Sequence, residues 1–176
     1  MLSDAEHPDT SKELAERILH ARAERYAAAN EEEQTVLATV VTFLRGESRY
    51  ALPLTNLREI RPLVRFCPIA LAPPVIPGIV HFRGELLSVH DLAAFTRPDA
   101  RGVAPSWLLV AEHDDTRMGL AADDVMDVIE IAEGAVLPVP LTLGDATEVF
   151  TGMTREGILI VDGVKVFEVA RFAQAF

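Results

Sequence analysis

From residue 36 onward, short runs of apolar and β-branched residues alternate with turn residues. This pattern predicts strand–turn–strand units at 39–52, 78–89, 107–120 and 150–161. The six prolines between residues 53 and 77 all fall between the first two units. Brief strands joined by regular turns are typical of small β barrels, and not of a parallel sheet with crossover helices.

The first part of the chain has a different pattern. Residues 1–10 are polar, which predicts a tail, and Thr10 with Glu13 fits the capping box that begins a helix. The helix that follows has only a thin apolar stripe, which suits docking on the body of the protein or use as a partner-binding arm, and we favour docking. We therefore divide the chain into an N-terminal tail and helix, residues 1–35, and a β domain, residues 36–176.

The β domain carries an internal repeat. Two Glu-Ile pairs, at 59–60 and 130–131, lie 71 residues apart. Two predicted hairpins that open on a glycine end on Asp91 and Asp162, and these aspartates are again 71 residues apart. Matches in the same order predict that the domain consists of a duplicated β unit.

Composition excludes several classes of protein. The formal net charge is -11, which argues against nucleic-acid binding, because a binder needs a basic face to displace counterions from phosphate. Hydrophobic residues make up 49% of the chain, but no uncharged apolar run reaches the roughly 18 residues that a membrane helix needs. We therefore expect no insertion into a membrane. The single cysteine excludes an internal disulfide and fits a reducing cytoplasm.

The charges are unevenly distributed. Residues 45–65 contain five arginines and two glutamates, whereas residues 112–133 contain eight carboxylates and one arginine. This asymmetry fits two faces with different partners, and it fits a scattered solubilising surface equally well.

Candidate catalytic groups are few. His90 and Asp91 are adjacent in a predicted strand, so their side chains point to opposite faces. A turn at 83–84 would pair His81 with Leu86, so His81 and His90 would not be neighbours, which argues against a shared metal site. Cys67 lies in an apolar stretch and is interpreted as a buried structural thiol. We therefore predict no enzyme activity, no metal and no cofactor.

Four motifs occur in order along the chain: Leu57-x-Glu59-Ile60, Pro73-x-x-Ile76-x-Gly78-Ile79-Val80, Arg83-Gly84 and Val89-x-Asp91-Leu92. Together they resemble the signature of the CheW-like family, the coupling proteins of bacterial chemosensory arrays. The resemblance extends from residue 36 to the C-terminus.

The resemblance implies a mainly β fold of two interlocked, five-stranded SH3-like barrels, to which the N-terminal helix is added. It implies a non-catalytic adaptor, cytoplasmic and peripheral to membrane receptor arrays. The implied partners are the cytoplasmic tip of a chemoreceptor and the regulatory domain of a CheA-type histidine kinase, which carries a copy of the same fold.

The resemblance also implies a receptor-binding site. Its motif positions are Leu57, Glu59, Gly78, Arg83 and Gly84, and Ile79 and Leu57 would supply apolar contact. In this interpretation Arg83 stands at the hairpin tip to bind carboxylates of a receptor helix, instead of being a solvated turn residue. The kinase-binding residues are left unassigned.

The chain departs from the family pattern where His81-Phe82 replaces the usual Asn-Leu before Arg83. This departure is compatible with a protein of a flagellar pathway. It is equally compatible with an auxiliary paralogue that serves twitching or surface sensing. Two other functions stay open: a β-barrel module that senses a small molecule, and an enzyme that uses Cys67 or His90.

Overall fold

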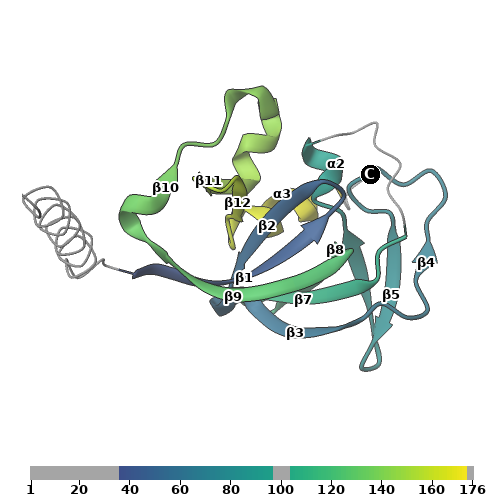
Figure 1. Ribbon diagram of the computed structural model, residues 1–176. Helices are drawn as coiled ribbons and strands as arrows, with labels where there is room; N and C mark the ends of the chain where they lie inside the picture. Colours follow the sequence, from purple (N-terminus) through teal and green to yellow (C-terminus); the bar gives the residue numbers. More distant parts are fainter. Residues whose placement is uncertain (1–35, 97–103, 174–176) are drawn as a thin grey trace, which may run out of the picture. The chain divides into compact units, whose positions relative to one another are not determined.

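Twelve strands and several short helices follow residue 35 in the computed structural model, which describes residues 36–96 and 104–173 (Figure 1). The predicted N-terminal tail and helix lie outside these residues. The elements of the first half are β1 (Val36–Arg45), β2 (Ser48–Pro53), η1 (Leu54–Asn56), β3 (Leu57–Pro62), β4 (Cys67–Pro68), β5 (Gly78–Phe82), β6 (Glu85–His90) and α2 (Ala93–Thr96). Those of the second half are β7 (Trp107–His113), β8 (Thr116–Ala122), β9 (Asp124–Ala132), η2 (Glu133–Ala135), β10 (Val136–Leu137), η3 (Leu141–Val149), β11 (Phe150–Thr154), β12 (Ile158–Val161) and α3 (Lys165–Ala173).

The strands form two six-stranded sheets. Sheet A has the order β10-β11-β12-β2-β1-β9, and sheet B has the order β3-β7-β8-β6-β5-β4. Neighbouring strands are antiparallel except for two parallel pairs, β2 with β12 and β6 with β8. All four predicted strand–turn–strand units are present as hairpins.

The two sheets have the same construction. Each strand of sheet B corresponds to the strand of sheet A whose number differs by six, so that β3 corresponds to β9 and β7 to β1. With these replacements the strand order of sheet B becomes that of sheet A read from its other end. Each half gives one hairpin to the sheet of the other half: β1 and β2 lie in sheet A with β9 to β12, and β7 and β8 lie in sheet B with β3 to β6. This topology agrees with the duplication that the sequence predicts.

The expected number of strands was wrong by one in each sheet. A two-residue strand, β4 in sheet B and β10 in sheet A, is added next to β5 and β11. Such short strands carry too few residues to show an alternating pattern, so the sequence gives no signal for them.

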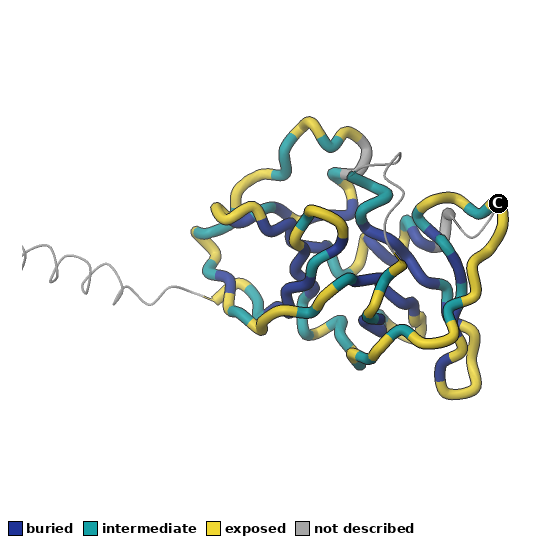
Figure 2. Tube along the Cα trace, turned by 45° about the vertical axis from the view of Figure 1, so that its right-hand side comes forward, coloured by how far each residue is buried: buried dark blue, intermediate teal, exposed yellow. Residues whose placement is uncertain are grey.

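The buried residues form three clusters. One cluster lies between the sheets and includes Phe43, Tyr50 and Phe167, and its aromatic rings stack from Phe43 through Tyr50 to Phe150. The second is confined to sheet B and the third to sheet A. Figure 2 shows this burial along the central strands, with exposed residues in the connections. Each sheet therefore packs around apolar residues of its own as well as on the other sheet.

Candidate functional site

The hairpin of β5 and β6 ends in a two-residue turn. Phe82 pairs with Glu85, which leaves Arg83 and Gly84 as the turn. Both have positive φ, 47° and 92°, as a type I′ turn requires. Gly84 suits this conformation, whereas an arginine adopts it at an energetic cost. The predicted turn and the predicted pairing of His81 with Leu86 are confirmed.

Arg83 is paired with a carboxylate of its own chain. Its Nη2 donates a hydrogen bond to Oε2 of Glu59 on β3, at 2.6 Å. In a flat sheet, β3 and β5 would lie four strand spacings apart, which is roughly 19 Å. The ion pair therefore requires sheet B to curl, so that the hairpin tip approaches its opposite edge. The Arg83 side chain is 71% exposed, and Glu59 is largely covered.

A phenylalanine lies beneath the pair. The Phe82 ring is buried, and the guanidinium carbon of Arg83 lies 5.4 Å from its centre. The guanidinium carbon of Arg61, also on β3, lies 5.7 Å from the same ring centre. Both distances are within the range of cation–π contact. Nothing in the local sequence pattern marks the contact of Arg61 with Phe82, because it depends on the curl of the sheet.

Two of the expected site residues take part in packing. Gly78 is buried, and a Cβ there would meet the Phe66 ring at 2.6 Å and come even closer to the carbonyl oxygen of Cys67. Leu57 packs against the cluster between the sheets. The structure thus brings Glu59 and Arg83 together and places Gly84 at the exposed tip. Gly78 and Leu57 instead pack against residues in the interior.

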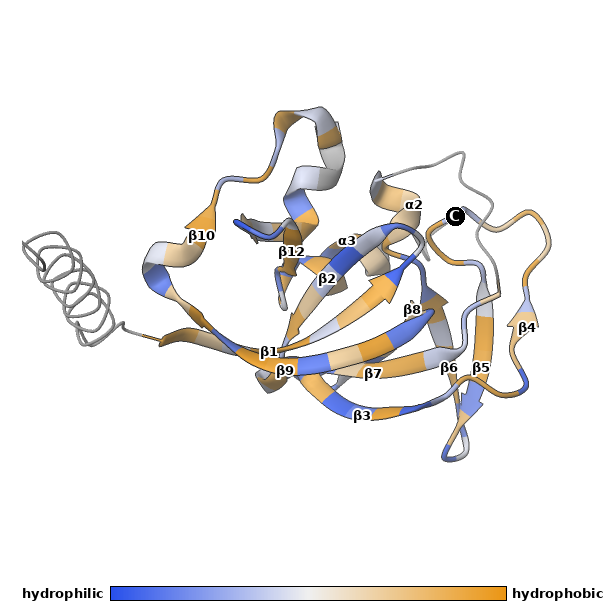
Figure 3. Cartoon of the chain, viewed as in Figure 1, coloured by the Kyte–Doolittle hydropathy of each residue, from blue (hydrophilic) through white to orange (hydrophobic). Residues whose placement is uncertain are grey.

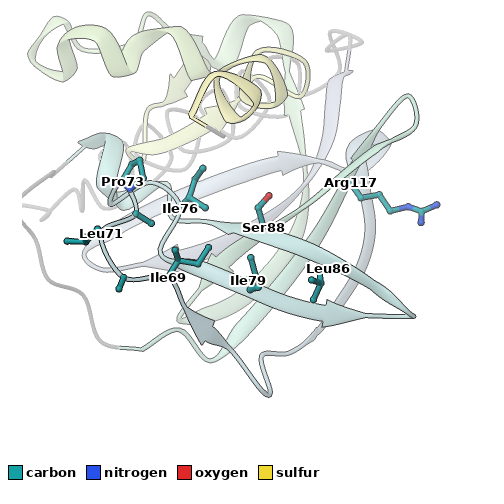
Figure 4. A pocket seen from close by; sticks show the side chains of 10 residues that line it. Ile69, Leu71, Pro73, Ile76, Ile79, Leu86, Ser88 and Arg117 are labelled. Atoms are coloured by element: carbon teal, nitrogen blue, oxygen red, sulfur yellow. The ribbon is translucent and has the colours of Figure 1, made fainter. Parts of the chain in front are cut away.

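Ile79 lies on the outer face of the hairpin, in an apolar groove. The groove has a volume of about 610 Å³ and lies over β5, β6 and the loop before β5 (Figure 4). Its lining is mostly aliphatic: Ile69, Ala70, Leu71, Ala72, Pro73, Ile76, Ile79 and Leu86, with Ser88 and Arg117. Figure 3 shows the apolar character of this loop and of β5.

Two leucines of the groove are strongly exposed. Leu86 is 69% exposed, and Leu71 is fully exposed with a φ of 62°. Strand alternation could have indicated Leu86, because it faces away from the buried Leu87. The conformation of Leu71 has no sequence signal, since nothing marks a leucine for the left-handed region.

The two groups considered for catalysis are on different strands, Cys67 on β4 and His90 on β6. Cys67 is exposed, so its predicted burial was wrong, because its apolar neighbours form a short edge strand and not a core strand. His90 is buried, its Nε2 lies 2.9 Å from Oγ of Ser88, and burial lowers its pKa to about 4. The residues that the structure describes contain no cluster of His, Cys, Asp or Glu that could hold a metal ion. They also contain no helix long and apolar enough to cross a membrane.

Two sheets that exchange strands, a charged hairpin tip and an exposed apolar groove define a protein-interaction module. Its prominent surface features are an arginine fixed by a carboxylate and aliphatic side chains open to solvent. These are features by which proteins dock on one another.

Comparisons with known proteins agree. A family model of the CheW-like domain matches residues 39–171. The chemotaxis protein CheW of Helicobacter pylori is 24% identical over 161 residues, which cover 91% of this chain and 95% of that protein. The probable chemotaxis protein CheW of Rhizobium etli is 27% identical over 124 residues, covering 70% of this chain and 77% of that protein. The crystal structure of the scaffolding protein TtCheW from Thermoanaerobacter tengcongensis matches with a TM-score of 0.60 and 27% identity, covering 71% of this chain and 88% of that one.

The chain belongs to the CheW-like domain family. It is an adaptor that couples receptors and the kinase CheA in chemotaxis signalling.

Proposed function

We propose that the chain performs this coupling through two separate surfaces of sheet B. The receptor surface is the hairpin tip with the Arg83–Glu59 pair, and the kinase surface is the apolar groove on the outer face of the same hairpin. The single observation that carries the proposal is the Arg83–Glu59 ion pair, because it fixes an exposed guanidinium where the tip of the β5–β6 hairpin meets the edge strand β3.

The receptor surface uses charge to select and orient its partner. Glu59 restrains Arg83 through one of the five N–H donors of the guanidinium, and the described contacts leave the other four for a ligand. The partner is the glutamate-rich helical tip of a chemoreceptor. In this proposal Glu59, Arg83 and Gly84 form the contact, whereas Leu57 and Gly78 hold β3 and β5 in place beneath it.

The groove suits a partner of different chemistry. Its aliphatic lining and its exposed Leu71 and Leu86 match the apolar core of a protein interface and offer little to a charged helix. We assign it to the β fold of the kinase regulatory domain. Ile79, expected from the resemblance at the receptor surface, belongs to the kinase surface in this proposal, because its side chain lines the groove.

Several finer features of the family are carried over as proposals. They are closure of the two curled sheets into interlocked barrels, the absence of catalytic activity, and a cytoplasmic location at the periphery of receptor arrays. Service in a flagellar pathway and service as an auxiliary paralogue are both compatible with these features.

The test is a calorimetric titration against two partners from the same organism, a fragment of a chemoreceptor tip and the regulatory domain of the kinase. Arg83→Glu is expected to abolish receptor binding and to leave kinase binding and the β-sheet circular dichroism spectrum unchanged. Arg58→Glu is the matched control, because Arg58 lies on β3 with a 60% exposed side chain outside the Arg83–Glu59 pair.

Loss of both interactions in Arg83→Glu would contradict two separate surfaces. Failure of the wild-type chain to bind either partner would reject the proposal, and the small-molecule sensor would then become the leading alternative. The volume of the groove lies within the range of ligand sites, so a thermal-shift screen of metabolites would test that alternative.

A further inference from the structure

We propose that Arg61 and Arg83, which share the Phe82 ring, form a binding site for a carboxylate side chain of the receptor segment. The inference rests on the proposed receptor surface and adds Arg61 to it as a second residue that determines specificity. Phe82 is the positioning residue that holds the two guanidinium groups.

The two guanidinium groups contact the same ring. Each central carbon lies less than 6 Å from the centre of the Phe82 ring, so the two carbons cannot be farther apart than about twice that distance. Phe82 is 3% exposed, which fixes the ring beneath the two cations, and the hydrogen bond to Glu59 restrains Arg83 over it.

The charges around the ring are not balanced. Glu59 makes its hydrogen bond to Arg83. Within residues 36–96 and 104–173, Arg61 has no carboxylate within ion-pair distance, although its side chain is partly covered. Two positive charges therefore face one negative charge, and a second carboxylate placed between the guanidinium groups would neutralise the cluster.

The geometry favours a carboxylate of a protein partner. A guanidinium group presents N–H donors in a planar fork that matches the two oxygens of a carboxylate, and a lysine cannot reproduce this fork. Arg83 projects from the tip and Arg61 from the edge strand, so a ligand between them contacts both ends of the curled sheet. A glutamate on an exposed helix reaches such a site without unfolding.

The test compares Arg61→Gln with Arg58→Gln in titrations against the chemoreceptor tip fragment and the kinase regulatory domain. Arg58 is the matched control, because it is on the same strand and has the same charge but does not contact the Phe82 ring. Arg61→Gln is expected to weaken receptor binding about tenfold, as loss of a hydrogen bond to a charged group does. Arg58→Gln is expected to change receptor binding less than about twofold, because exposed charges contribute little. Neither variant is expected to change kinase binding.

Two further variants separate recognition from folding. Arg61→Lys keeps the charge, and it is expected to recover only part of the lost receptor affinity, because the fork is missing. Phe82→Leu keeps an apolar side chain but removes the ring, and it is expected to weaken receptor binding while kinase binding is retained. Receptor affinity of the wild-type chain should fall with ionic strength more steeply than that of Arg61→Gln.

Receptor binding by Arg61→Gln at wild-type affinity would overturn the inference. If Arg83→Glu abolished binding in the same series, the proposed receptor surface would stand without Arg61. Absence of receptor binding by the wild-type chain would reject the proposed function and this inference together.

Discussion

Asp91 and Asp162 occupy equivalent positions in the two halves, and each caps the helix that follows it. Oδ1 of Asp91 accepts a hydrogen bond from the backbone N–H of Ala93, and Oδ1 of Asp162 accepts bonds from Val164 and Lys165, all at 3.0 Å. Oδ2 of Asp91 also accepts hydrogen bonds from Nε and Nη2 of the buried Arg45, at 2.9 and 2.5 Å. Asp91 thereby joins sheet B to β1 of sheet A.

The electrostatics of this link are favourable. Burial acts to lower the pKa of Arg45, but its hydrogen bonds and charge interactions with Asp91 and Asp123 outweigh burial, so the pKa lies above its ordinary value. Nη1 of Arg45 donates to Oδ1 of Asp123 at 2.5 Å, and Oδ2 of Asp123 accepts a bond from the backbone N–H of Gly46.

The two aspartates are therefore expected to differ in their effect on stability. Asp91→Ala removes one carboxylate partner of the buried Arg45 guanidinium. Breaking a buried ion pair in this way typically lowers the free energy of unfolding by about 3–5 kcal/mol. Asp162→Ala removes a helix cap, which costs about 1 kcal/mol. Urea denaturation of the two variants measures both values, and equal losses would contradict a special role for the Arg45–Asp91 link.

Gly78 is expected to be required for folding itself. Gly78→Ala forces a Cβ into the Phe66 ring and the backbone of β4, and such overpacking typically costs about 1–3 kcal/mol. Gly152, its counterpart in sheet A, is crowded in the same way by Val136 and Leu137. Gly134→Ala is the control, because a Cβ at Gly134 meets open space. Thermal unfolding followed by circular dichroism compares Gly78→Ala, Gly152→Ala and Gly134→Ala, and a wild-type melting temperature for Gly78→Ala would indicate a binding role instead.

Local pattern predicted much of this fold. The β-branched runs and their turns located all four hairpins, and the spacing of Asp91 and Asp162 revealed the duplication. Each of these signals lies within a short stretch of the chain, where alternation and turn chemistry act directly.

Contacts between distant segments were harder to predict. The exchange of the β1–β2 and β7–β8 hairpins between the halves, and the curl that brings Arg83 to Glu59, depend on packing of the whole domain. Cys67 shows the same limit, because its apolar neighbours do not reveal that β4 is a short strand at the edge of sheet B. The six residues expected from the family resemblance therefore divide into a charged contact, two packing positions, a turn glycine and a groove residue.

His90 is expected to make the fold less stable in mild acid. Burial lowers its pKa to about 4, whereas a histidine in the unfolded chain has a pKa near 6.5. As pH falls through 6.5 the unfolded state takes up a proton that the folded state does not, so stability decreases until pH approaches 4. Between pH 7.5 and pH 5 the loss attributable to His90 is about 2 kcal/mol.

Urea denaturation at these two pH values measures that loss. His90→Gln is expected to reduce the difference between them by most of this amount. His81→Gln is the matched control, because His81 is exposed on the neighbouring strand of the same hairpin. An unchanged difference in His90→Gln would show that other groups cause the acid sensitivity.

Leu71 is expected to exchange stability for binding. A leucine with a φ of 62° is strained by roughly 1–2 kcal/mol, and full exposure means that this strain is not offset by burial. Strain of this kind persists where function requires it, and here it displays an apolar side chain at the rim of the groove.

Leu71→Asn suits the left-handed conformation, so it is expected to raise the free energy of unfolding by about 1 kcal/mol. The same variant is expected to weaken binding of the kinase regulatory domain and to leave receptor binding unchanged. Asp114→Asn, at another exposed turn position with positive φ, is the control and should change neither. Kinase binding at wild-type affinity in Leu71→Asn would remove this loop from the kinase surface.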